Sequence, residues 1–164
     1  MTELRGKRVT LRPFRAEEFR LEDGALPENR ERLRRRYARS GAFHDGFLDL
    51  AIEVDGRLVG EIDARRGRNM IPQGVYELGI ALFDAADRGQ GYGREAVALL
   101  TDHLFRELGA GRVQGSTSVE NAGMRRVFER CGFTFEGVMR GFMPAPGGER
   151  DDYALYAVTR ADRS

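Results

Sequence analysis

Apolar and polar residues alternate in two different rhythms along the chain. A period of two on both sides of the turn Asp55-Gly56 predicts a hairpin of strands Phe47–Val54 and Arg57–Ala64. Spacings of three and four predict a helix over Glu95–Leu108, with a buried stripe of Val97, Leu100, Leu104 and Leu108. Helical segments are expected over Ala16–Arg39, with interruptions near Gly24 and Pro27, and a further helix is expected after Asn121. The remaining strands are expected over Val9–Phe14, Val75–Phe83, Arg112–Ser118, Phe133–Met143 and Asp151–Thr159. This order predicts an α/β fold with a mixed, mostly antiparallel sheet of about seven strands flanked by helices.

Length and composition are those of one compact domain over residues 1–164, with 41% hydrophobic residues to form a core. No apolar run approaches the length of a membrane span, and the first residues contain no signal-peptide core, so we expect a soluble cytoplasmic protein, a monomer or homodimer. The net charge of +1 gives no field for specific nucleic-acid binding. We interpret the arginine-rich segment Arg30–Arg39 as a solvated helix face and the single cysteine, Cys131, as a packing residue.

A glycine-rich loop, Arg88-Gly89-Gln90-Gly91-Tyr92-Gly93-Arg94, lies between a predicted strand and a predicted helix. Glycines at alternate positions allow backbone N–H groups to turn toward one point, and the N-terminus of the helix adds the positive end of its dipole. The loop therefore predicts a site for an anion such as a phosphate.

Two common classes of phosphate loop fit this segment poorly. A Walker loop needs Gly-Lys-Ser/Thr, but the only lysine of the chain is Lys7. A dinucleotide-binding loop starts directly from a strand and has an acidic residue about twenty positions later. Here the polar segment Asp84–Arg88 intervenes, and the nearest later acid, Glu107, falls inside the predicted helix.

A second motif follows in the segment Glu120–Phe133. Asn121 is a natural helix N-cap, and Gly132 is suited to end the helix before the next strand. With Arg126 and Val127 between them, these residues resemble the Asn-x-x-(Ser/Ala)-x-Arg-Val motif of the Gcn5-related N-acetyltransferases (GNAT). The glycine loop resembles the Arg/Gln-x-x-Gly-x-Gly/Ala loop of the same family, with Arg88, Gly91 and Gly93 at the matching positions. The order and separation of the two motifs also match, and the likeness extends over nearly the whole chain.

This resemblance implies a GNAT-type fold that binds acetyl-CoA as cosubstrate, without a metal, between the strands Val75–Phe83 and Arg112–Ser118. In the family these two strands splay apart and the pantetheine arm enters the gap. The resemblance assigns pantetheine contacts to the backbone of Ala81, Leu82 and Phe83 and to Asn121, and pyrophosphate contacts to the loop residues Arg88, Gly89, Gln90, Gly91, Tyr92, Gly93 and Arg94. Either Arg126 or Arg130 is expected to approach the ribose phosphate.

Acetylation of an amine needs a group that takes the proton of the amine, and a partly buried carboxylate is suited to this role. Glu77 aligns with the strand glutamate that acts as base in histone-acetyltransferase members and is our candidate. Reserve candidates are Glu61, Asp63, Glu136, Asp151 and Asp152. The residues that often reprotonate coenzyme A in the family are replaced here by Phe128 and Met124, so we expect Tyr156, Tyr92 or water in that role.

The opening strand and the Glu-Leu-Gly stretch before the loop look most like the RimJ/RimL branch, which acetylates protein N-termini and, in other members, small amines. We therefore expect an acetyl-CoA-dependent N-acetyltransferase acting on a protein or peptide N-terminal α-amine. Small amines such as polyamines, amino acids or aminoglycosides are the alternative acceptor. The absence of the usual tyrosine and serine leaves a second alternative, a non-catalytic acyl-CoA-binding sensor.

Overall fold

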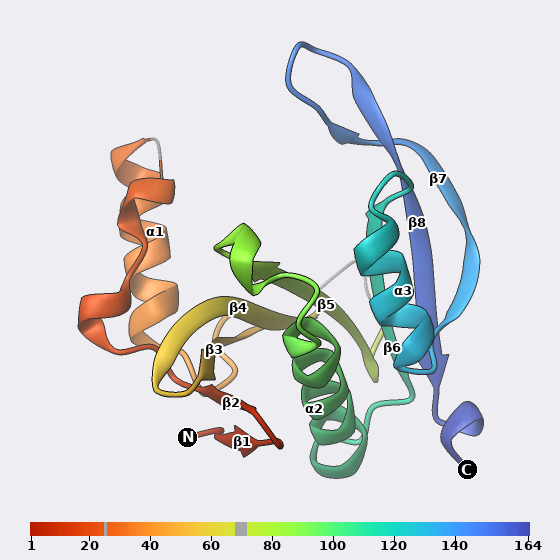
Figure 1. The fold of residues 1–164 in the computed structure, drawn as a ribbon, viewed down its shortest axis with the longest axis horizontal. Coiled ribbons are helices and arrows are strands. Elements are labelled where there is room, and N and C mark those ends of the chain that lie inside the picture. The colour runs from red at the N-terminus through yellow and green to blue at the C-terminus, as the bar shows by residue number, and fades with distance from the viewer. Residues whose placement is uncertain (25, 68–71) are drawn as a thin grey trace.

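The computed structural model describes residues 1–24, 26–67 and 72–164, and it shows one mixed sheet with helices on both faces (Figure 1). The expected polar loop Arg65–Gly74 lies partly outside the described residues. The strands are β1 (Leu4–Arg5), β2 (Val9–Arg12), β3 (Phe47–Val54), β4 (Arg57–Arg66), β5 (Val75–Leu82), β6 (Arg112–Ser118), β7 (Thr134–Pro144) and β8 (Arg150–Thr159). The α-helices are α1 (Pro27–Ala38), α2 (Tyr92–Glu107) and α3 (Ala122–Arg130).

The strands form one sheet in the order β1-β2-β3-β4-β5-β6-β8-β7. All neighbours are antiparallel except β5 and β6, which are parallel over four register pairs, from Val75↔Arg112 to Leu78↔Gly115. The predicted fold class is therefore confirmed, with eight strands in place of about seven. The additional strand, β1, has two residues, too few for a hydrophobic period to reveal it.

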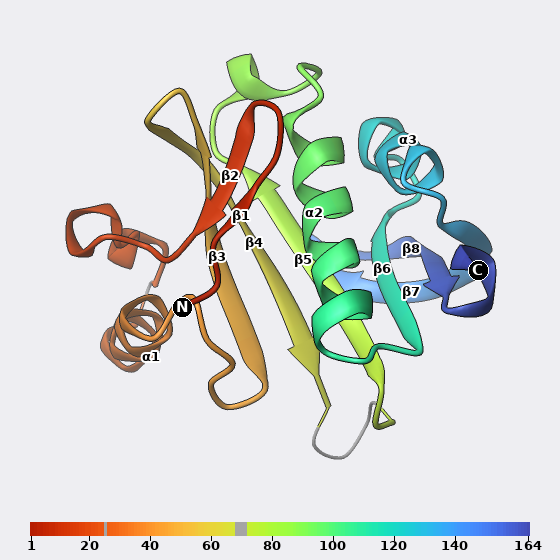
Figure 2. The ribbon, with the colours of Figure 1, turned by 90° about the horizontal axis from the view of Figure 1, so that it is seen from below.

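Helix α2 lies in front of the strands in Figure 2, and Figure 1 shows α1 and α2 on opposite sides of the sheet. Successive strand residues point to opposite faces. On β3, Leu50 belongs to the main core cluster with α2, and the next residue, Ala51, belongs to a second cluster with Tyr37 of α1. Helix α3 packs beside α2, against β6 and β7.

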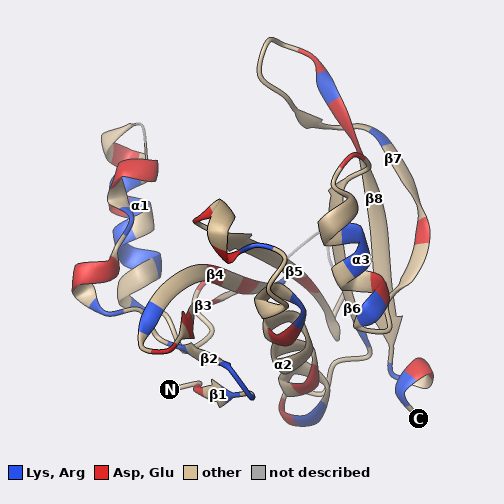
Figure 3. Cartoon of the chain, in the orientation of Figure 1, with Lys and Arg blue, Asp and Glu red and all other residues tan. Residues whose placement is uncertain are grey.

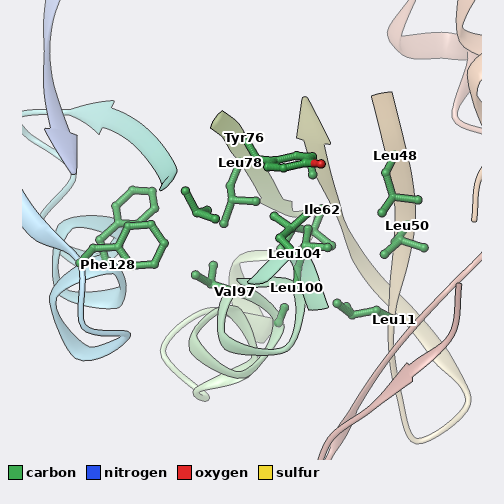
Figure 4. Close-up of a cluster of buried hydrophobic side chains, with 14 of the residues drawn as sticks. Leu11, Leu48, Leu50, Ile62, Tyr76, Leu78, Val97, Leu100, Leu104 and Phe128 are labelled. Atoms are coloured by element: carbon green, nitrogen blue, oxygen red, sulfur yellow. The ribbon is translucent and has the colours of Figure 1, made fainter. Parts of the chain in front are cut away.

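The main core lies between α2 and the sheet (Figure 4). The predicted stripe residues Val97, Leu100 and Leu104 are fully buried, and they meet Ile62 and Leu78 from the strands. Burial of each such side chain contributes about 1.5–3 kcal/mol. Helix α2 is thereby fixed against β4 and β5, and its N-terminus is held at one edge of the core. No helix in the described part of the chain is long and apolar enough to cross a membrane.

Helix α2 begins at Tyr92, three residues before its predicted start, because its N-cap is a glycine inside the loop. Gly91 has φ +86°, a left-handed conformation that glycine adopts without strain, and its carbonyl accepts the first helical hydrogen bond, from Glu95 N at 3.1 Å. The glycine loop and the first turn of α2 are therefore one continuous structure.

Candidate active site

The parallel strands β5 and β6 separate beyond the pair Leu78↔Gly115, and both continue without pairing to each other, to Leu82 and Ser118. Phe128 of α3 lies against this point of separation, since a Cβ on Gly115 would be 2.5 Å from the edge of its ring. Phe128 is 1% exposed and stacks on Tyr156 of β8, with 5.4 Å between ring centroids. Glycine is required at position 115 because the aromatic ring occupies the space of a side chain.

The backbone of β5 presents hydrogen-bonding groups to the open side between these strands. Phe83 N donates to Val59 O at 3.0 Å, and the carbonyl oxygen of Ala81 would be 2.3 Å from a Cβ on Gly60 of β4. Because backbone groups alternate in direction along a strand, those of Ala81 and Phe83 face β4, and those of Ile80 and Leu82 face the opening. The expected pantetheine contacts of Ala81 and Phe83 do not fit this geometry. The predicted contact of Leu82 is compatible with this geometry, and Ile80 has the same orientation.

The glycine loop has the geometry of an anion site. Gly89 and Gly91 have φ of +73° and +86°. Within the described part of the chain, the backbone N–H groups from Gly89 to Arg94 have no hydrogen-bond acceptor. Unpaired N–H groups at the start of a 16-residue helix attract negative charge. The predicted phosphate-binding role of Gln90–Arg94 is therefore geometrically possible.

Arg8, in the turn between β1 and β2, reaches this loop from a distant part of the sequence. Its Nη2 donates to Gln90 O at 2.6 Å, and its guanidinium lies 5.0 Å from the ring centroid of Tyr92. Glu95 Oε1 accepts hydrogen bonds from Arg8 N and Val9 N, at 2.9 and 3.0 Å. The sequence contains no local signal for this contact, because 82 residues separate Arg8 from Gln90.

The remaining predicted cofactor residues lie on the same side of the molecule. Figure 3 shows basic positions on α3 and in the segment that leads into α2. Arg88 Nη2 donates to Leu82 O at 3.2 Å, which ties the loop to the end of β5. Asn121 Oδ1 accepts from Met124 N at 3.0 Å, so its side-chain amide group is left to donate to a ligand. Arg126 and Arg130 are exposed.

Cys131 lies where α3 meets the loop. Its thiol donates to Arg94 O at 3.4 Å, and burial raises the pKa of the thiol to about 11. A thiol with this pKa is almost fully protonated at neutral pH and is a weak nucleophile. The packing role predicted for Cys131 agrees with this environment.

Tyr156 does not have the environment that a general acid needs. It is fully buried, its hydroxyl oxygen accepts from Arg125 Nε at 3.0 Å, and its hydroxyl donates to Glu129 Oε1 at 3.2 Å. Its proton is already used in a hydrogen bond to a carboxylate. We therefore correct the predicted catalytic role of Tyr156: this side chain joins β8 to α3. The sequence alone could not show these contacts, because Arg125 and Glu129 belong to α3 and Tyr156 to β8.

The face of the sheet under α1 carries the strand carboxylates. Glu77, Asp63 and Glu61 project from β5 and β4 on this face, and a hollow there is lined by Leu33, Arg36, Tyr37, Asp49, Glu61, Ile62 and Asp63. Glu77 Oε2 is 3.9 Å from Arg65 Nη1. Tyr37 donates to Glu61 at 3.2 Å, and burial raises the pKa of the Glu61 carboxyl. These three acids are therefore within one region.

The other reserve acids lie in different surroundings. Glu136 pairs with Arg112 at 2.7 Å, at the start of β6 and away from the opening, and this arginine lowers the pKa of the carboxyl. Asp152 accepts from Gly141 N at 2.7 Å, and Asp151 is exposed on the β7–β8 hairpin. In residues 1–24, 26–67 and 72–164, no group of three or more His, Cys, Asp or Glu side chains is placed to hold a metal ion.

Comparison with known proteins identifies the family. Residues 8–134 match the acetyltransferase (GNAT) domain family. The chain is 28% identical over 153 residues to the probable N-acetyltransferase YjcK of Bacillus subtilis (strain 168), covering 91% of this chain and 78% of YjcK.

Solved structures agree at the level of the fold. RimL, a ribosomal L7/L12 α-N-protein acetyltransferase in complex with coenzyme A, superposes with a TM-score of 0.77 at 18% identity, covering 96% of this chain and 98% of RimL. The microcin C7 self-immunity acetyltransferase MccE, in complex with acetyl-CoA and AMP, gives 0.75 at 17% identity, covering 94% and 93%. The resemblance drawn from the two sequence motifs is confirmed, and the non-catalytic alternative is disfavoured. The chain belongs to the GNAT acetyltransferase family and is an N-acetyltransferase.

Proposed function

We propose that this enzyme transfers the acetyl group of acetyl-CoA to the α-amine of a protein or peptide N-terminus. The observation that carries the proposal is the separation of β5 and β6 beyond Leu78↔Gly115, directly beside the unpaired N–H groups at the start of α2. An opening with backbone groups directed into it, next to an anion site, suits a long ligand with a phosphate at one end and amides along its arm.

In this proposal, the N–H groups of Gln90–Arg94 bind the pyrophosphate, and Arg8 adds a positive charge beside them. The backbone groups of Ile80 and Leu82 pair with the pantetheine amides, and the amide group of Asn121 donates to the same arm. Arg126 or Arg130 approaches the ribose phosphate. RimL and MccE, which have the same fold, were solved with coenzyme A and acetyl-CoA respectively, which supports this arrangement.

Acetyl-CoA, when bound, supplies an activated thioester, and the protein must supply a neutral amine beside it. A protonated amine has no lone pair for attack, so a carboxylate on the acceptor side must take its proton. The departing thiol has an ordinary pKa near 8.5, so its thiolate is a good leaving group. With Phe128 and Met124 at the usual positions of the general acid, and Tyr156 engaged by Arg125 and Glu129, Tyr92 or water remains to protonate the thiolate.

The chemistry of amines supports an α-amine as the acceptor, and the face under α1 bears on the alternative. An α-amine, with a pKa near 8, has a larger neutral fraction at pH 7 than a lysine side chain with a pKa near 10.4. RimL is by its name an α-N-protein acetyltransferase. One observation favours the alternative of a small polycationic amine, namely the three acids Asp49, Glu61 and Asp63 that line the hollow.

The experiment is a thiol-release assay with acetyl-CoA and a panel of acceptors. The panel contains short peptides with free N-termini, the same peptides with blocked N-termini, a polyamine and an aminoglycoside. We expect turnover with the free peptides, and the acetylated product identified by mass. Turnover with the small amines alone would show that the acceptor is not a peptide.

A further inference from the structure

Asp63 lies against β5 at the point where β5 and β6 separate. Its register partner is Gly79, the first residue of β5 beyond the last pair with β6. A Cβ on residue 79 would be 2.7 Å from Asp63 Oδ1. The carboxylate therefore occupies the space of the missing side chain, directly over the backbone at the start of the opening.

The Asp63 carboxylate is also poorly satisfied. Its Oδ2 is buried and, among the described residues, forms no hydrogen bond. The same Oδ2 forms an ion pair with Arg65 Nε at 3.1 Å, and the guanidinium of Arg65 is also 3.9 Å from Glu77. Asp49 of β3, Glu61 of β4 and Arg36 of α1 are the other charged groups around Asp63. Because this close ion pair is not aligned as a hydrogen bond, the Asp63 carboxylate keeps lone pairs that can accept a proton from a ligand.

The hollow under α1 gives Asp63 an open side between α1 and β4. Its lining includes Asp63 and, from α1, Leu33, Arg36 and Tyr37. A peptide N-terminus bound in this hollow would lie next to Asp63, whose register partner is the first residue of β5 beyond its pairing with β6. Burial, as the first cause, raises the pKa of Asp63 to about 6. Such a group is ionised at pH 7 and is still basic enough to take a proton efficiently.

Glu77, the candidate from family alignment, is less well placed. Its register partner on β6 is Gln114, inside the part of the strands that is still paired. Two residues of strand, about 7 Å, separate Glu77 from Gly79. Its closest cation is the same Arg65 that lies beside Asp63.

We infer that Asp63, and not Glu77, is the general base of this enzyme, and this inference rests on the proposed acetyl transfer. The amine nitrogen forms a bond to the thioester carbonyl carbon, and the C–S bond breaks with its electron pair going to the thiolate. The proton of the attacking amine passes to Asp63 Oδ2, and from there to solvent.

The test measures kcat and kcat/KM between pH 5 and 9 for the wild type, Asp63→Asn and Glu77→Gln with the best peptide of the panel. We expect Asp63→Asn to lower kcat on the order of a hundredfold and to remove an acidic limb near pH 6 that the wild type shows. Glu77→Gln should retain this limb and lose no more than about fivefold. The matched control is Asp55→Asn, which removes an exposed acid at the turn of the same β3–β4 hairpin and should keep the limb.

The outcomes separate this inference from the proposed function. A wild type that turns over, together with an Asp63→Asn enzyme of similar kcat, would overturn the role of Asp63 alone. A hundredfold loss in Glu77→Gln, or a wild-type profile without a limb near pH 6, would also overturn it, even if Asp63→Asn failed to fold. A wild type that releases no thiol with any amine would overturn the proposed function itself. Retained melting shifts with acetyl-CoA report that each variant is folded.

Discussion

The two faces of the central sheet are built from the same strands and have opposite character. On the face toward α2, β3 and β4 contribute Leu50 and Ile62, both fully buried. On the face toward α1, the neighbouring residues Asp49, Glu61 and Asp63 line a polar hollow. The strand period of two thus separates an apolar face, which holds α2 and the proposed cofactor loop, from a charged face where we propose that the acceptor binds.

This difference has an energetic consequence. Buried apolar side chains stabilise the fold, whereas a buried carboxylate that lacks well-aligned hydrogen bonds costs free energy. The acceptor face therefore has a lower stability than the sheet could reach with apolar residues there. The catalytic role proposed for Asp63 would account for a carboxylate at this unfavourable position.

The largest expected effect comes from truncating a buried side chain on the face toward α2. Leu100→Ala removes a fully buried side chain and should lower the free energy of unfolding by about 2–5 kcal/mol. Leu33→Ala, on the half-buried α1 side, should lower it by only about 1 kcal/mol. Urea unfolding of both variants measures the difference. Equal losses would show that the two faces are packed alike.

Asp63→Asn should increase the free energy of unfolding instead of lowering it. The pKa of Asp63 is raised from 3.8 to about 6 in the folded protein. Ionisation of Asp63 therefore lowers the free energy of unfolding as the pH rises through this interval, and the full destabilisation is present above pH 6. The neutral asparagine avoids the loss, so the variant should be about 1–2 kcal/mol more stable than the wild type at pH 7.5. At pH 3.5 the gain should vanish. Thermal melts at both pH values test this, and a variant less stable at pH 7.5 would contradict it.

Arg8→Gln should give the smallest effect, and this effect should be limited to the binding of acetyl-CoA. Loss of the guanidinium next to Gln90 should raise KM for acetyl-CoA about three- to tenfold, and more at low salt than at high salt. Arg5→Gln is the matched control, because Arg5 lies on the same hairpin and pairs with Glu3 instead of the loop. An identical change in KM for both variants would refute a specific role for Arg8.

Sequence patterns predicted those parts of the molecule that depend on neighbouring residues. The hairpin around Asp55-Gly56, the buried stripe of α2 and the Asn121 cap follow from local rules of turns, periods and capping. The glycine loop was recognisable for the same reason, since one short segment supplies all its N–H groups.

The sequence could not predict features that depend on contacts between distant segments. Arg8 reaches the loop across 82 residues, and Asp63 reaches the opening only through the pairing of β4 with β5. The burial of Tyr156 against α3 and the turning of Ala81 toward β4 likewise follow from packing and register. Alignment with the family favoured Glu77 because it compares positions along one strand and not distances between strands.

The central claim is that the two faces have separate roles, and calorimetric titration with acetyl-CoA tests it most directly. Gly91→Val places a branched side chain at φ +86° in the loop, with its Cβ 2.8 Å from Arg8 Nη2. We predict that this variant loses at least about a hundredfold in affinity. Asp63→Asn, on the other face, should bind acetyl-CoA with the Kd of the wild type. Undiminished binding by Gly91→Val, or a comparable loss in Asp63→Asn, would contradict the account.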